Sequence, residues 1–353
     1  MLQLYAMNAQ PKVLVIYTGG TIGMVNDPKT GALMAFDFGD IYKHIPELAR
    51  LKVELTSKAF DTPVDSSEMN PQLWAEIARI VQENYELFDG FVILHGSDTM
   101  AFTASALSFM LQNLEKPVIL TGSQLPIGTI RTDGKENLIT AIEIAAAKTE
   151  NGNPRITEVA IYFEYSLYRG NRTSKISASA FEAFRSPNFP PLAVAGVHID
   201  YKDTCADLSQ NAEKQLEMTV FTEFNPDVAL IKLFPGLPWK AYAGLFDIRK
   251  LKGIVIETFG SGNASSDETF HELLTAYIAS GGVVVNITQC ATGTVEQGKY
   301  ETSSFFEKNG VLSGKDLTTE AAITKLMYAL GRYPGNPSKI KSIFLQPVCG
   351  EQE

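Results

Sequence analysis

The sequence contains few cysteines, and their placement limits the chemistry that they could perform. The three cysteines, Cys205, Cys290 and Cys349, are odd in number, widely separated and not in the spacing of a metal site. That pattern fits a reducing compartment better than a disulfide framework, so we expect a cytoplasmic protein. None of the three stands beside a histidine in the sequence, which disfavours a cysteine nucleophile.

Long apolar runs and an excess of basic residues are lacking as well. No apolar run reaches the length of a membrane span, and the amino-terminal residues have neither the basic flank nor the apolar length of an export signal. The formal net charge of −10 argues against nucleic acid and against an anionic membrane surface as partners, because both bind basic surfaces. We therefore expect a small molecule as the substrate.

The four histidines form no recognisable catalytic or metal-binding motif. His95 lies close to Ser97, but no G-x-S-x-G nucleophile elbow surrounds it. His271 and Glu272 begin a segment that lacks the second histidine of the zinc-binding helix motif. We therefore expect neither a metal ion nor another cofactor, and a lysine or a tyrosine in place of histidine as the base.

What the sequence does contain is an ordinary globular composition with a regular alternation of strands and helices. A chain of 353 residues, 45% hydrophobic and 20% charged, is expected to form two domains. Apolar β-branched runs, such as residues 159–163, alternate with helical patterns of the length found in βαβ units. The sequence therefore predicts an α/β fold with a doubly wound, mostly parallel sheet in the larger N-terminal domain, residues 1–200.

A second, smaller α/β domain is expected at residues 228–353. The polar stretch that begins near residue 200 lacks apolar periodicity, and we assign residues 201–227 to a linker region. Beyond it the alternation restarts, with a strand expected at residues 253–258 and a helix over about residues 267–279.

The first apolar run, residues 13–17, ends near a glycine pair that is followed by Thr21. Such a run is typical of a parallel strand buried on both faces, and a ligand is expected at its carboxyl end. Gly19 and Gly20 have no Cβ, so their N–H groups can approach a small anionic group, while the β-branched Thr21 can hold its hydroxyl in one direction. Thr21 is the candidate nucleophile. The glycine spacing meets neither the dinucleotide nor the phosphate-loop fingerprint, and a simple tight turn is the alternative.

Hydroxyl side chains follow two further expected strands in the same way. Ser66 and Ser67 come after the second strand, and Ser97 stands with Asp98 and Thr99 after the third. Each of these positions could instead cap the helix that follows it. In a parallel sheet, however, all the strand ends lie at one edge, so the set can converge on a single crevice.

Several segments resemble the signatures of the bacterial-type L-asparaginases, in particular the cytoplasmic type I branch. Three long matches are YTGGTIG at residues 17–23, HGSDTM at residues 95–100 and YRGNRTSK at residues 168–175. Shorter matches at residues 65–67, 260–263 and 293–300 extend the likeness over nearly the whole chain.

The resemblance implies that Thr21 attacks the side-chain amide carbon of L-asparagine and forms an acyl-enzyme. It also implies that Lys175 and Asp98, together with the hydroxyl of Ser97, form a second catalytic group. Asp98 and Ser66 would hold the α-amino and α-carboxylate ends of the substrate. The substrate-binding set that we expect is Gly20, Asp65, Ser66, Ser67, Gly96, Ser97 and Asp98.

The sequence departs from the family pattern at particular positions. The second motif usually carries threonine where this chain has Ser97, which keeps the hydroxyl but loses the β-branch. Many members carry a tyrosine in the loop after the nucleophile, whereas residues 31–40 contain none. In those members the tyrosine activates the nucleophile, and we assign this role to Tyr300 by likeness to some type I members. Glu257 stands where some relatives use an arginine to bind a second, regulatory asparagine, so we do not expect that effector site in the same form.

Other functions remain as alternatives at the level of the sequence. A broader amidase could accept glutamine, or deliver ammonia as the related transfer-RNA amidotransferase subunit does. That subunit has an extra amino-terminal domain, whereas only twelve residues precede Val13. A non-catalytic amino-acid sensor could share the fold, but it would not need Thr21, Asp98 and Lys175 together. By analogy with relatives, we expect a homodimer or homotetramer.

Overall fold

The computed structural model describes residues 10–26, 33–35, 45–202, 216–298 and 301–353. The chain divides into two compact units, each of which is described by itself. The first comprises Met1–Ser186 and Pro190–Val220, and the second comprises Pro187–Phe189 and Phe221–Glu353. Residues 203–215 of the predicted linker region lie outside the described part of the chain. None of the described helices is long and apolar enough to cross a bilayer.

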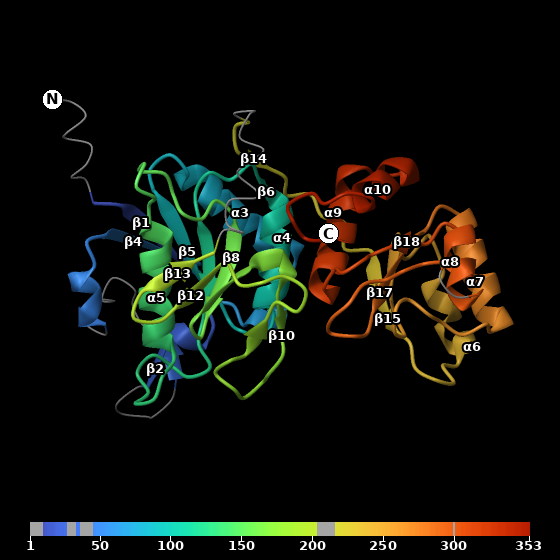
Figure 1. Cartoon of the computed structure of the whole chain (residues 1–353), viewed down its shortest axis with the longest axis horizontal. Coiled ribbons are helices and arrows are strands. Elements are labelled where there is room, and N and C mark those ends of the chain that lie inside the picture. Colours follow the sequence, from blue (N-terminus) through green and yellow to red (C-terminus); the bar gives the residue numbers. More distant parts are fainter. Residues whose placement is uncertain (1–9, 27–32, 36–44, 203–215, 299–300) are drawn as a thin grey trace. The chain divides into compact units, whose positions relative to one another are not determined.

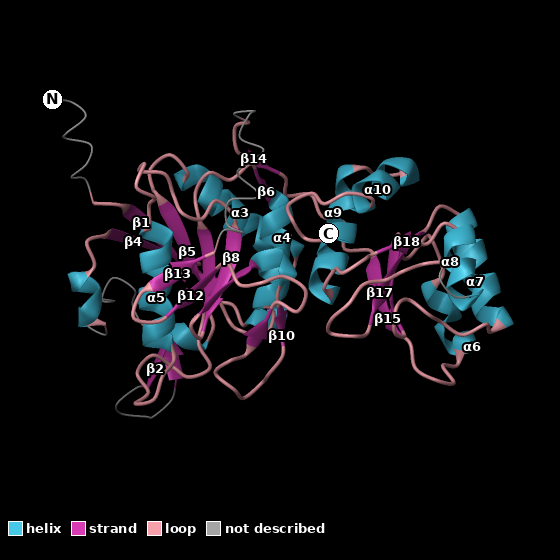
Figure 2. Cartoon of the chain, in the orientation of Figure 1, coloured by secondary structure: helices cyan, strands magenta, loops and turns pink. Residues whose placement is uncertain are grey.

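An eight-stranded mixed sheet forms the centre of the first unit (Figures 1 and 2). The strand order is β13-β12-β9-β8-β7-β5-β1-β4. The strands from β8 to β4 run parallel, and β9, β12 and β13 continue the sheet with antiparallel pairings. Their bounds are β1 (Lys12–Tyr17), β4 (Glu54–Ala59), β5 (Gly90–Leu94), β7 (Val118–Thr121), β8 (Val159–Phe163), β9 (Ser166–Arg169), β12 (Ala193–Ala195) and β13 (Ile199–Tyr201). The predicted fold class is confirmed.

The order of the parallel strands places a topological switch point between β1 and β5. The chain runs from β1 to its outer neighbour β4 and then crosses to β5 on the other side of β1. In open α/β sheets, ligands bind outside the carboxyl ends of the strands at such a point. The loops that follow β1, β4 and β5 are therefore the expected walls of a site.

Within the described residues, three helices cover this sheet: α3 (Pro71–Asn84), α4 (Met100–Met110) and α5 (Gly134–Ala146). Helix α5 packs on β5 and β7, while α4 packs on β8 and against α3, and Figure 1 shows α4 and α5 on opposite faces. All but one of the α4 residues are buried, which explains why its sequence has only apolar and small hydroxyl side chains and no charged ones. Helix α3 begins at the Asn70 cap, whose side chain accepts hydrogen bonds from the N–H groups of Gln72 and Leu73.

The other described elements of the first unit are short. They are β2 (Met24–Asn26), β3 (Leu33–Ala35), β6 (Leu111–Gln112), β10 (Ser174–Lys175), β11 (Phe184–Arg185) and β14 (Thr219–Val220), with the 3-10 helices η1 (Thr21–Gly23), η3 (Pro46–Arg50), η4 (Ser66–Glu68) and η5 (Gly170–Arg172).

The second unit contains a four-stranded parallel sheet with helices on both faces. The strands, in order, are β15 (Val228–Lys232), β16 (Gly253–Thr258), β17 (Val283–Thr288) and β18 (Leu312–Ser313). The helices are α6 (Trp239–Tyr242), α7 (Glu268–Ala279), α8 (Glu301–Lys308), α9 (Thr319–Arg332) and α10 (Pro337–Phe344), and a 3-10 helix, η8 (Ala243–Leu245), follows α6. This is the smaller α/β domain that the sequence predicts.

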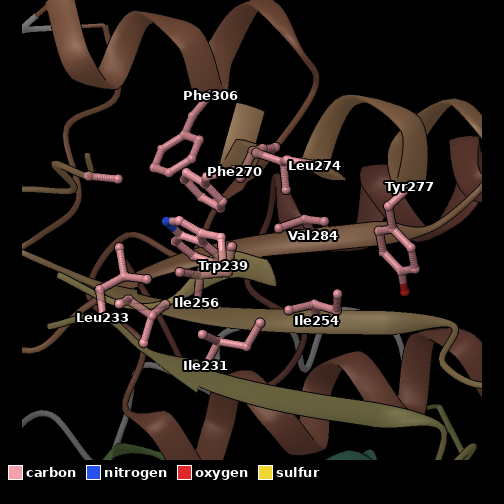
Figure 3. Close-up of a cluster of buried hydrophobic side chains, with 13 residues drawn as sticks. Ile231, Leu233, Trp239, Ile254, Ile256, Phe270, Leu274, Tyr277, Val284 and Phe306 are labelled. Carbon is pink, nitrogen blue, oxygen red and sulfur yellow. The ribbon is translucent and has the colours of Figure 1, made fainter. Parts of the chain in front are cut away.

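Each face of the second sheet has its own apolar core. Alternate residues of β16 point to opposite faces, so Ile254 and Ile256 join one cluster and Val255 joins the other. Figure 3 shows the first cluster, in which the rings of Trp239 and Phe270 stack with centroids 3.9 Å apart. The second cluster packs β16 and β17 against α9 and α10.

A fully buried ion pair attaches the carboxyl-terminal segment to the second unit. Lys325 Nζ on α9 lies 2.5 Å from Glu351 Oε1, and neither side chain is exposed. Lys325 also donates to the carbonyl of Gln346 and to Oε1 of Gln352, both at 3.1 Å. Burial lowers the pKa of Lys325, and the charge of Glu351 opposes that shift. The three acceptors surround the ammonium group and hold residues 346–352 against α9.

Lys325→Met is expected to lower the free energy of unfolding by about 3–5 kcal/mol, because it leaves the Glu351 carboxylate buried without its cation. Urea unfolding followed by circular dichroism measures the change. Lys250→Met, at an exposed lysine of the same unit, is the control and is expected to change stability by less than about 0.5 kcal/mol. Equal stabilities of the two variants would contradict this role of the ion pair.

Candidate active site

Glycines allow the three strand ends to meet without side chains between them. A Cβ built on Gly19 would lie 2.1 Å from the carbonyl oxygen of Val64, and one on Gly20 would lie 2.5 Å from the N atom of Gly96. A Cβ on Gly96 would lie 2.6 Å from Ser66 Oγ. Gly19 and Gly20 also have φ values of 138° and 89°, which disfavour any other residue. The loops after β1, β4 and β5 therefore touch one another at this sheet edge.

Thr21 stands directly beyond the point where Gly20 meets Gly96. It is the first residue of η1, whose N-cap is Gly20, and it is partly exposed. Thr18, three residues earlier, differs from it in environment. Its side chain is fully buried and its hydroxyl donates to the carbonyl of Leu94 at 3.0 Å. Of these two hydroxyls, the one at position 21 is therefore the one accessible to a ligand.

The segment after β4 contributes one buried hydroxyl and one local cap. Ser66 is only 4% exposed and lies against Gly96, and its carbonyl accepts a hydrogen bond from Thr99 Oγ1 at 2.6 Å. The Asp65 carboxylate accepts from both the N–H and the hydroxyl of Ser67, each at 2.8 Å. These bonds lower the pKa of Asp65, the backbone bond most strongly. Among the three, Ser66 lies against Gly96 at the strand-end contact, whereas Asp65 caps η4 by bonding Ser67.

Lys175 bridges the two polar groups that follow β5. Its Nζ donates to Ser97 Oγ at 2.9 Å and to Asp98 Oδ1 at 2.6 Å. The Lys175 side chain is 15% exposed, whereas that of Asp98 is 71% exposed. A lysine, a hydroxyl and a carboxylate in contact can exchange protons, and the exposed carboxylate is free to meet the amino group of a ligand. Gln124 Oε1 lies 3.5 Å from Ser97 Oγ on another side.

A buried ion pair supports the segment that carries Lys175. Arg169 Nε donates to Glu158 Oε2 at 2.6 Å, and the second guanidinium contact to Oε1 is 3.3 Å. Burial raises the pKa of Glu158, and the charge of Arg169 opposes that shift. Thr173 Oγ1 then donates to the carbonyl of Arg169 at 2.7 Å, and η5 between them packs on α4. These contacts fix the backbone two residues before Lys175.

His95 is buried and bonded within the fold. Its Nδ1 lies 2.6 Å from the carbonyl oxygen of Gly96, and its Nε2 lies 2.9 Å from Thr103 Oγ1. Burial lowers the pKa of His95 to about 4, so the ring is neutral near pH 7. A fully buried, doubly bonded imidazole is not placed to abstract a proton from a ligand.

The structure thus places nine of the sequence-predicted site residues at one edge of the first unit: Gly20, Thr21, Asp65, Ser66, Ser67, Gly96, Ser97, Asp98 and Lys175. Tyr300 lies outside the described residues. Sequence reasoning missed the contacts of His95, the Arg169–Glu158 pair and the approach of Gln124 to Ser97. His95 and Arg169 lie within the motifs at residues 95–100 and 168–175, whereas Glu158 and Gln124 lie outside all of the motifs.

Comparison with known proteins adds independent information. A family model described as "Asparaginase, N-terminal" matches residues 12–206, and one described as "Glutaminase/Asparaginase C-terminal domain" matches residues 227–344. The chain is 40% identical over 321 residues to L-asparaginase 1 of Escherichia coli K12, covering 91% of this chain and 92% of that protein. It is 38% identical over 367 residues to a 60 kDa lysophospholipase of Mus musculus, covering 98% of this chain and 63% of that protein. The crystal structure of L-asparaginase I from Vibrio cholerae matches with a TM-score of 0.86 and 36% identity, covering 98% of this chain and 100% of that one.

Proposed function

The chain belongs to the asparaginase family, and from that premise we propose that it hydrolyses the side-chain amide of L-asparagine to L-aspartate and ammonia. The observation that carries the proposal is the contact of Lys175 Nζ with both Ser97 and Asp98. Lys175 is 78 residues from Ser97 and 77 residues from Asp98 in the sequence. The three side chains meet at the same sheet edge as Thr21. A binding protein would not need a lysine, a hydroxyl and a carboxylate in this arrangement.

In the proposed mechanism, Thr21 Oγ attacks the side-chain amide carbon and forms a tetrahedral intermediate. Lys175, Ser97 and Asp98 transfer the hydroxyl proton to the leaving nitrogen, so that ammonia departs and an ester joins the acyl group to Thr21. Water then attacks the ester carbon, and the same groups return a proton to Thr21 Oγ as aspartate is released. Each turnover consumes one water, needs no oxidant or reductant, and proceeds without a cofactor or a metal ion.

Substrate orientation follows from the charges at the sheet edge. The exposed Asp98 carboxylate is suited to the α-amino group, and the Ser66 hydroxyl to the α-carboxylate. Backbone N–H groups at the strand ends would stabilise the developing oxyanion, which is often the largest single contribution to catalysis of acyl transfer. Gly20 and Gly96, whose lack of side chains lets the loops come into contact, lie at these strand ends.

Ammonia release from L-asparagine and from L-glutamine, measured across a concentration series, tests the proposed function. We expect ammonia and aspartate in equal amounts from asparagine. Faster release from glutamine would favour a broader amidase, and saturable asparagine binding without ammonia would favour a sensor. Either result would replace the proposed reaction.

Tyr300→Phe is expected to lower kcat for asparagine by at least about tenfold, or about 1.4 kcal/mol, with a smaller change in KM. The reason is that residues 31–40 contain no tyrosine that could polarise Thr21, so we assign that hydroxyl to Tyr300. Tyr42→Phe is the control. Damage by Tyr42→Phe combined with normal kinetics of Tyr300→Phe would reverse the assignment.

We further propose that the enzyme is cytoplasmic and forms a homodimer or a homotetramer. The cysteine pattern and the type I resemblance support the location, and analogy with relatives supports the assembly. Light scattering on the purified protein measures the oligomeric state directly. With a net charge of −10, neither nucleic acid nor an anionic membrane is a proposed partner.

A further inference from the structure

We propose that His95 is a positioning residue that fixes the plane of the peptide between Gly96 and Ser97. It does so as the last link in a chain of hydrogen bonds that begins at Trp74 on α3 and passes through Thr103 on α4. The proposal rests on the proposed function, since its value lies in how it presents Ser97 to the reaction. It assigns a task to a buried histidine that the mechanism itself does not use.

In the series of hydrogen bonds from Trp74 to Gly96, the donor at the first residue and the acceptor at the last determine the direction of every bond. Trp74 Nε1 can only donate, and it lies 3.0 Å from Thr103 Oγ1. The Gly96 carbonyl can only accept, so His95 Nδ1 must carry the proton in its 2.6 Å bond. The neutral ring then has Nε2 as an acceptor, and the Thr103 hydroxyl donates to it at 2.9 Å. One tautomer and one ring orientation satisfy all three bonds.

Holding the Gly96 carbonyl also sets the direction of the next N–H group. No peptide bond in the described part of the chain is cis, so the 96–97 peptide is planar and trans. In a trans peptide the carbonyl and the N–H point in opposite directions, and therefore the Ser97 N–H points away from His95. The same plane contains the N and Cα atoms of Ser97, from which its side chain extends to the Oγ that accepts from Lys175.

Because residue 96 is a glycine, a contact from another residue is needed to restrict its backbone conformation. Glycine has no side chain to restrict its backbone, and it adopts many conformations in the absence of other contacts. Ser66 and Gly20 approach Gly96 closely, which excludes a Cβ there but does not bond its carbonyl. A Cβ on Gly122, directly after β7, would lie 2.4 Å from the His95 carbonyl oxygen, so the backbone there closely approaches the residue before Gly96. The imidazole is the group that bonds the Gly96 carbonyl.

Two substitutions of His95 separate its two hydrogen bonds. In His95→Asn, the short amide places an N–H donor near the position of Nδ1, so it can still bond the Gly96 carbonyl. In His95→Gln, the longer amide reaches the position of Nε2 and Thr103 but withdraws the donor from Gly96. We expect His95→Asn to keep kcat within about threefold of the parent chain. We expect His95→Gln to lose at least about tenfold in kcat, with KM within about threefold.

Equal kcat losses in the two variants, or a larger loss in His95→Asn, would overturn the positioning role, as would unchanged kcat in both. Thermal unfolding of each variant is measured in parallel, because a merely structural role predicts that kcat of the folded protein stays unchanged while the melting temperature falls. The parent chain is the control for the proposed function. A parent that releases no ammonia overturns that function, whereas equal losses on an active parent overturn only the inference about His95.

Thr103 provides a second test if a His95 variant does not fold. Thr103→Ser keeps the hydroxyl that donates to Nε2, and Thr103→Val replaces it with a methyl group of similar size. We expect Thr103→Ser to match the parent chain and Thr103→Val to lower kcat by about two- to threefold, less than His95→Gln, because the ring keeps its donor to the Gly96 carbonyl but loses the contact that orients it. The same kcat in both variants would overturn the relay.

Discussion

Replacing Thr21 by alanine is expected to lower kcat for asparagine by at least about a thousandfold, because it removes the atom proposed to attack the substrate. The fold should be unaffected, since Thr21 is partly exposed and follows Gly20 at the start of η1, outside the core. Some asparagine binding should also remain, because Ser66 and Asp98 are unchanged. Ammonia release measures the first effect, and calorimetric titration with asparagine measures the second.

Thr62→Ala is the matched control for this experiment. Thr62 is an exposed threonine in the connection between β4 and η4, so its loss is expected to leave kcat within about twofold of the parent chain. An activity of Thr21→Ala within a few-fold of the parent would assign the nucleophile to another residue. A kcat loss of similar size in both variants would point to damage of the sheet edge rather than to loss of the attacking atom.

Most of the parallel strands could be predicted from the sequence because they are uninterrupted apolar runs, whereas β4 (Glu54–Ala59) is largely polar and exposed. Strands β8 (Val159–Phe163) and β16 (Gly253–Thr258) have the predicted bounds. The antiparallel continuation of the first sheet could not be predicted. It begins with the tight hairpin between β8 and β9, whose turn residues Glu164 and Tyr165 have φ values of 42° and 68°. Neither is the glycine or asparagine that usually marks such a turn, so no local signal indicated it.

In the candidate site, too, some residues could be predicted from their position after a strand, whereas others depend on contacts between distant segments. Gly20, Ser66 and Gly96 follow parallel strands, and the sheet alone predicts that they meet. The contact of Lys175 with Ser97 and Asp98 could be expected only from the family resemblance. Lys175 lies in the two-residue strand β10, which comes after η5, and the sequence there has no apolar periodicity that predicts its position. The bonds of His95 depend on which residues of α3 and α4 face the end of β5. How these helices pack cannot be predicted from a single sequence.

Lys175→Met is expected to lower kcat by at least about a hundredfold, the scale of a lost acid–base group. Methionine matches the length of the lysine stem but has no donor, so Ser97 Oγ and Asp98 Oδ1 lose their common partner at 2.9 and 2.6 Å. The pH dependence of kcat should also change, because a group proposed to move protons is absent. KM is expected to rise, since Asp98 is no longer held where it meets the substrate.

The control for Lys175 is Lys148→Met, which removes a lysine from an exposed ion pair with Asp89 at 2.9 Å in the same unit. Exposed pairs contribute little, so this variant should keep kcat and the parent pH–rate profile. If Lys175→Met loses stability but keeps the parent profile and kcat, the lysine only holds Ser97 and Asp98 in place, and another group must transfer the proton. If kcat falls and the profile changes while the melting temperature stays near that of Lys148→Met, the loss belongs to the chemistry. The contrast between the two lysines therefore separates proton transfer from simple charge pairing.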